Sequence, residues 1–130
     1  MKSIAIVLLL LFGCKKQIAE PYTPVELKNT DSLVYYINKV RIDSGLTELK
    51  TEQSLVLLSE KKVALMIQDG KPSHNGFSID DTNALSLSQI VGFGYRTDKA
   101  LFIAYMKSDL HRKFILMPKM THVGAFTKDK

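Results

Sequence analysis

The stretch YMKSDLHRKFILMPKMTHVGAF, residues 105–126, decides how this chain of 130 residues folds. It begins with the end of an aromatic-led helix, passes through a polar turn and a hydrophobic trio, and becomes a strand-like run at 121–126. Ser108 and Asp109 are good capping residues, so we expect His111 in the first turn of a short helix. The positive end of that helix would favour a neutral imidazole or a nearby anionic ligand. His111 is therefore a candidate site residue.

The N-terminus has the layout of an export signal. Lys2 gives a short cationic start, and Ile4 to Phe12 is an unbroken run of nine apolar residues. A helix needs about 20 such residues to cross a bilayer core, so the run fits the core of a signal peptide instead. The alternative is a buried N-terminal strand or helix, which is weaker because no turn or cap residue brackets the run. We predict a signal peptide over residues 1–13.

Leu11-Phe12-Gly13-Cys14 resembles the lipobox of bacterial lipoproteins, in which the cysteine becomes the lipidated first residue; Phe12 departs from the small residue usual there. Cys14 is the only cysteine, so no intramolecular disulfide can form. A lone cysteine after a signal core is better explained as a lipid anchor than as a reactive thiol. Anchoring on more than one acyl chain holds a protein firmly on a membrane. The expected location is the bacterial cell envelope, on the outer or cytoplasmic membrane and facing outside the cytoplasm.

The charge distribution gives little support for nucleic-acid binding. Removal of residues 1–13 takes Lys2 from the 18 basic residues and leaves 17 against 13 acidic ones, a net charge of +4. The basic residues are spread through the chain, with some excess from Lys107 onward, and they form no stripe interleaved with aromatic residues. A solvated surface facing anionic lipid or envelope polymer explains this charge better.

Local patterns divide the rest of the chain into a tether and one domain. Residues 14–29 comprise the cysteine and a proline-containing, polar segment without clear periodicity, which is typical of a tether. We expect the folded domain over residues 30–130.

Hydrophobic spacing predicts a first helix over residues 31–43, capped by Thr30 or Asp31, and a second over residues 52–68, capped by Thr51. A third helix is expected to begin at Asp98. Residues 85–94 alternate weakly and fit a short strand or an irregular crossing. The turn-rich segment at 72–76 carries His74, and such surface loops often hold site residues.

Two stretches together resemble the SCP/CAP superfamily, the fold of cysteine-rich secretory and pathogenesis-related proteins. INKVR at 37–41, followed by SGL at 44–46 and Leu49, resembles the family's LN-x-x-R and G-L-x-x-L pattern. YMKSDLHR at 105–112, with IL and THVG behind it, resembles the bacterial signature W-M-x-S-P-G-H-R-x-x-I-L…T-H-I-G-V-G. Between them, ALM and SH at 64–66 and 73–74 match the spacing A-x-M…S-H. The ordered set covers about residues 32–126.

The resemblance implies an α+β fold, an α-β-α sandwich around a small antiparallel sheet. It also implies a cleft where two histidines meet, matched here by His74 and His111. Acidic residues usually complete this cleft, but Ser88 replaces the glutamate of the G-E-N-I motif, and Ser108 falls about where animal members carry the second glutamate. Family members normally add a last strand after the G-V-G run, whereas this chain stops at Lys130, so we expect a sheet lacking that strand and keeping an open edge.

Two histidines without a carboxylate can still hold a divalent metal such as zinc, but they supply too few ligands for a closed structural site. The alternative role of His74 and His111 is structural, through hydrogen bonds between loop and helix. Ser108, Asp109 and His111 include the residue types of a hydrolase triad, but such close positions in a turn rarely form the required relay. His122, on the strand-like run, is expected to be structural.

We therefore expect an envelope-anchored domain that acts by binding a lipid, a glycan or a protein rather than by catalysis. The alternative is a divalent-metal-dependent hydrolase that uses the His74/His111 cleft, which the missing carboxylate weakens. A third interpretation is a degenerate or truncated copy with no retained site.

Overall fold

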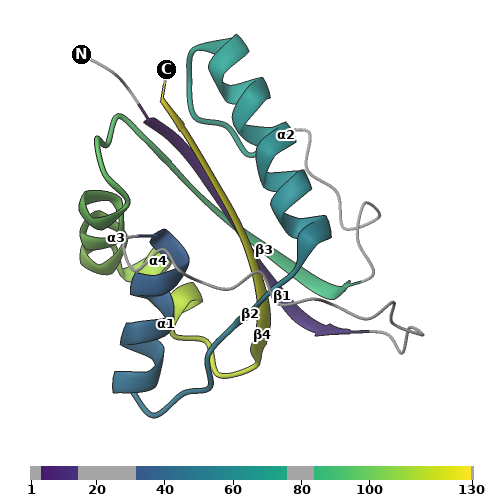
Figure 1. The fold of residues 1–130 in the computed structure, drawn as a ribbon, viewed down its shortest axis with the longest axis vertical. Helices are drawn as coiled ribbons and strands as arrows, with labels where there is room; N and C mark the ends of the chain where they lie inside the picture. Colours follow the sequence, from purple (N-terminus) through teal and green to yellow (C-terminus); the bar gives the residue numbers. More distant parts are fainter. Residues whose placement is uncertain (1–3, 15–31, 76–83, 130) are drawn as a thin grey trace.

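A four-stranded sheet forms the centre of the protein in a computed structural model, which describes residues 4–14, 32–75 and 84–129 (Figure 1). The strands lie in the order β2-β4-β1-β3. Their bounds are β1 Ile4–Cys14, β2 Lys50–Thr51, β3 Ala84–Phe93 and β4 Met120–Asp129. β1 pairs antiparallel with both β3 and β4, whereas the short β2 pairs parallel with β4. The sheet is thus mixed, where a purely antiparallel one was predicted.

Helices cover both faces of this sheet, which confirms the predicted α+β fold. Their bounds are α1 Leu33–Asp43, α2 Gln53–Asp69, α3 Asp98–Lys107 and α4 Asp109–Ile115. One hydrophobic cluster joins α1, α3 and α4 to the sheet, and a second joins α2 to β3 and β4. Figure 1 accordingly shows α2 apart from the other three helices, across the strands. No helix in these described segments is long and apolar enough to span a membrane.

The position of β1 differs from the sequence prediction. Ile4–Cys14 was expected to stand outside the domain, but it forms an interior strand of the sheet, paired on both edges. A strand that helices cover on both faces has a nearly continuous hydrophobic sequence, so the same apolar run suits a signal core and a doubly covered strand. The domain in this structure therefore includes β1. Removal of residues 1–13 and lipidation of Cys14 concern processing and stay predictions.

Helix boundaries lie close to the predicted ones, but two caps differ. Ser32 caps α1 by accepting a hydrogen bond from the Tyr35 backbone N–H, in place of Thr30 or Asp31. Glu52 occupies the N-cap of α2, where Thr51 was predicted, because Thr51 belongs to β2. α3 begins at Asp98 as predicted. The predicted tether, apart from Cys14, lies outside the described residues.

Two buried polar side chains of α1 fasten this helix to the rest of the domain. The Asn38 amide accepts from the Leu49 N–H at 2.8 Å and donates to the Leu49 carbonyl at 3.0 Å. Arg41 is 0% exposed and donates to carbonyls that lie between 6 and 79 residues away in sequence. Both residues were quoted in the sequence pattern, but their hydrogen-bond partners were not predicted.

Candidate functional site

A pocket of about 520 Å³ opens beside β3, and it contains three of the four predicted cleft residues. Its walls come from residues 72–74, from the end of β3 and from α3 with the start of α4. His74, Ser108 and His111 line it together with aromatic and aliphatic side chains. No aspartate or glutamate is among the described residues that line it.

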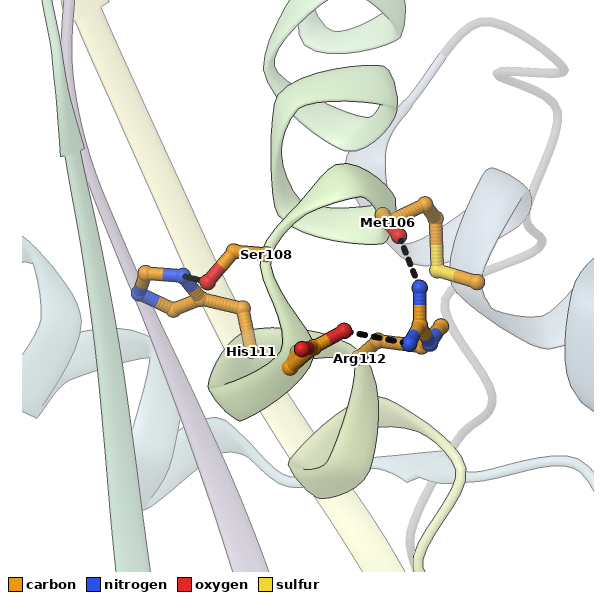
Figure 2. A network of polar contacts seen from close by, with 5 residues as sticks. Met106, Ser108, His111 and Arg112 are labelled. Carbon is orange, nitrogen blue, oxygen red and sulfur yellow. Dashed lines mark hydrogen bonds and ion pairs between the residues drawn. The ribbon is translucent and has the colours of Figure 1, made fainter.

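His111 lies in the first turn of α4, and its ring is held from two sides. Its Nδ1 lies 2.8 Å from the Ser108 hydroxyl, so the serine at the N-cap bonds the histidine rather than a backbone N–H (Figure 2). The Tyr105 ring packs against the imidazole, with centroids 4.9 Å apart. Burial, and secondarily the charge of His74, lowers the pKa of His111. The expected neutral imidazole therefore follows from burial and a neighbouring histidine.

His74 approaches from the segment before β3, and its orientation is set by a residue that the sequence analysis missed. Its Nδ1 lies 2.7 Å from the Gln89 Oε1. Because an amide oxygen only accepts, Nδ1 donates and the Nε2 of a neutral His74 keeps its lone pair. An imidazole whose other nitrogen donates to an oxygen is the usual arrangement of a metal-binding histidine.

Ser88, the fourth predicted cleft residue, is not among the described residues that line the pocket. Successive strand residues point to opposite faces, so Ser88 and Gln89 cannot both face His74. The neighbour, Gln89, makes the contact. The period-two alternation of residues 87–93 is the sequence signal that could have identified it.

Lys62 holds the segment that carries His74. This lysine is 2% exposed, and its ammonium donates to the Asn75 carbonyl, one residue beyond His74. Burial lowers the pKa of Lys62, and the carboxylate of Asp69 opposes the shift. A charged group inside α2 therefore positions the loop at the pocket rim, a role that helical periodicity alone did not indicate.

The polar residues around α4 do not form a hydrolase relay. The Asp109 carboxylate accepts from Arg112 at 2.5 Å, and Arg112 also donates to the Met106 carbonyl, whereas His111 bonds Ser108 (Figure 2). His122 lies on β4 with its Nδ1 2.8 Å from the Thr121 hydroxyl, and it does not line the pocket. Burial raises the pKa of Tyr105, so its phenol stays protonated at ordinary pH.

The described lining residues offer two imidazoles, hydroxyl groups and an aromatic wall. No group of three or more His, Cys, Asp or Glu that could hold a metal ion occurs in the described part of the chain. His74 and His111 fit an open site, in which solvent or a bound molecule would complete the coordination of a metal.

Changing Gln89 tests whether it orients His74. We expect Gln89→Leu to weaken Zn²⁺ binding about tenfold or more, because His74 loses the acceptor that fixes its ring. Gln89→Glu should strengthen binding, since a carboxylate at the same place adds negative charge beside the histidine. Calorimetric titration of the full chain with Zn²⁺ measures both effects. Equal affinities for all three proteins would show that Gln89 has no positioning role.

The pKa of His111 predicts how stability depends on pH. Because burial lowers the pKa of the folded state below the usual value of about 6.5, the unfolded chain binds the proton more readily. The contribution of the neutral ring is fully present above the unfolded pKa, and it declines as the pH falls through that value toward the folded pKa. Urea unfolding should show a smaller loss of stability on acidification in His111→Gln than in the parent. Parallel pH profiles would contradict this prediction.

No family model, curated protein or solved structure matches this chain.

Proposed function

We propose that this chain is an SCP/CAP-like domain of a bacterial cell envelope, anchored through lipidated Cys14, that binds a ligand in the pocket beside β3. The observation that carries the proposal is that His74 and His111, far apart in sequence, line one pocket, and that no carboxylate is among the described residues lining it. Burial and the neighbouring histidine keep His111 neutral, which favours hydrogen bonding over proton transfer with an acidic partner.

The pocket lining indicates what kind of molecule fits. Val91, Phe93 and Tyr95 offer apolar and aromatic surface, while the histidines and Ser108 offer hydrogen-bonding groups. The volume falls within the range of small-molecule pockets, about 300–1,000 Å³. A lipid or a glycan fragment of the envelope has this combination of apolar surface and hydroxyl or carbonyl groups. An extended protein segment is the third candidate.

Filling the pocket tests the proposal. Ala104 lines the pocket from α3, and Ile103, its neighbour, is exposed on the same helix. Ala104→Trp should abolish binding of phospholipids or peptidoglycan fragments, measured by calorimetry, whereas Ile103→Trp should bind like the parent. Binding that survives equally in both variants would place the ligand elsewhere. Absence of binding by the parent to every candidate would contradict the proposed ligand classes.

A second candidate is a divalent-metal-dependent hydrolase, favoured by the approach of His74 to His111. Zn²⁺ titration should give saturable binding that the His74→Ala/His111→Ala double variant loses. His122→Ala is the matched control, because this histidine lies on β4 outside the pocket. Zinc binding followed by ester or amide hydrolysis would support the enzyme, and zinc binding without turnover would favour the binding domain.

Membrane attachment is tested separately from ligand binding. Cys14→Ser should move the protein from the membrane fraction to the aqueous fraction of a bacterial host. Mass spectrometry of the membrane-bound form should show a chain that begins at an acylated Cys14. A membrane-bound chain that still carries Met1 and no acyl group would contradict the lipoprotein assignment.

A further inference from the structure

The predicted signal segment forms β1, an interior strand of the sheet. β1 lies between β3 and β4 and pairs with each through nine residue pairs. Among the described strands, β3 pairs with β1 alone. Loss of residues 1–13, as proposed for lipoprotein processing, would therefore remove eight of the nine pairs that β3 makes with β1 and leave only Cys14 opposite Ala84.

The two strands that flank β1 are held in place by helices as well as by β1. On one face, α2 packs against Val91 of β3 and Phe126 of β4 in a single cluster. On the other face, Ile90 of β3 and Val123 of β4 belong to one core with α1, α3 and α4. Neighbouring strands lie about 4.8 Å apart, so this packing holds β3 and β4 about two strand spacings from each other. They cannot pair without repacking both layers.

The strand position between β3 and β4 can be filled only by a segment with particular chemical properties. Helices cover both faces of the sheet, so a strand there must be apolar on both sides. Hydrogen-bonding groups of β3 and β4 face it from two edges, so it must also be extended and free of proline. Ile4 to Phe12 meets both requirements, with nine consecutive apolar residues.

We propose that the groove between β3 and β4 is a binding site for an extended apolar segment of a partner polypeptide, which enters in place of residues 1–13. Binding by strand addition supplies main-chain hydrogen bonds along both edges of the added segment. The entry of a partner rests on the proposed removal of residues 1–13. The strand position between β3 and β4 does not depend on that removal. Because β3 carries Gln89 and Gly92, occupancy of the groove also determines whether the pocket forms.

The full chain allows a direct test when a protease recognition sequence is inserted between Pro21 and Tyr22. After folding and cleavage, residues 1–21 are held without a covalent link, through the pairing of β1 with β3 and β4 and its contact with α2. We expect this fragment to stay bound on gel filtration. A fluorescent peptide of residues 4–13 with added terminal lysines should then replace it, saturably and one per chain. Hydrogen exchange of the β3 and β4 amides should remain slow while the peptide is bound.

A peptide carrying Val7→Pro and Leu9→Pro is the matched control, because each proline removes a donor from the centre of the strand. It should bind at least about tenfold more weakly. The proposed groove would be contradicted if the two peptides exchanged equally or if the fragment never exchanged. It would also be contradicted if the β3 and β4 amides stayed equally protected after the fragment had left. A dimer in which β1 crosses between copies would replace the partner by a second copy. An intact N-terminus in the membrane form would contradict the processing and, with it, the entry of a partner, but not the groove.

Discussion

Replacing Arg41 with methionine should lower the free energy of unfolding by about 4 kcal/mol or more, which is a large part of the 5–15 kcal/mol typical of a domain. Arg41 is 0% exposed and donates to four carbonyls, those of Thr47, Ile115, Met117 and Met120. Methionine would fill much of the volume but would remove the donor from all four carbonyls, including the buried bonds to Ile115 and Met120.

The expected loss is large because Arg41 ties three separate parts of the chain together. Its Nε donates to the loop after α1, and its Nη atoms reach the end of α4 and the turn into β4. The last carbonyls of a helix have no partner within the helix and carry partial negative charge, which a cation satisfies. A buried acceptor that loses its partner costs about 1–3 kcal/mol. Burial lowers the pKa of Arg41, but the guanidinium stays charged.

Urea unfolding of Arg41→Met, Arg41→Lys and Arg112→Met measures this prediction. Lysine keeps the charge but not the planar fork, so its stability should lie between those of the parent and the methionine variant. Arg112 is exposed and bonds Asp109 and the Met106 carbonyl, so its loss should cost about 1 kcal/mol or less. Equal effects at Arg41 and Arg112 would show that the buried carbonyls find other partners.

Replacing Gly124 with alanine should destabilise the domain by about 3 kcal/mol, the upper end for overpacking a core. An added Cβ would lie 2.3 Å from the Leu55 carbonyl carbon and 2.4 Å from the Val56 nitrogen. These are backbone atoms of the first turns of α2, so the helix as a whole must move off β4. The hydrogen bond from the Ser59 hydroxyl to the Gly124 carbonyl, 3.1 Å long, would be strained as well.

Gly92→Ala is the matched comparison, since it adds the same methyl group to another strand of the sheet. There the Cβ would meet the Leu101 Cδ1 at 2.2 Å and the Tyr105 hydroxyl at 3.0 Å, which are the ends of side chains. A side chain can rotate away where a helix backbone cannot, so Gly92→Ala should cost less. The Gly92→Ala/Leu101→Ala double variant should remove the main contact. A smaller loss at Gly124 than at Gly92 in thermal unfolding would contradict the prediction.

The sequence predicted the helices well because their signals are local. The apolar spacing of α1 and α2 and the left-handed glycine that ends α2, Gly70, all act within a few residues. The ordered resemblance also led to His74 and His111, which the structure places in one pocket. Ser88 was wrongly expected at the pocket because the motif alignment located the position but not the face of the strand.

Sequence by itself therefore determined which segments become helices, where the polar turns lie and which two histidines merit attention. Only the tertiary structure decided that Ile4–Cys14 forms β1, that Gln89 orients His74 and that Arg41 joins α1 to α4 and β4. A run of nine apolar residues has the same composition in a signal core and in a strand covered on both faces. The carbonyl partners of Arg41 lie up to 79 residues away in the chain. Hydrophobic periodicity and capping depend on residues that are close in sequence. The place of β1 and the partners of Gln89 and Arg41 depend on contacts between residues that are far apart in sequence.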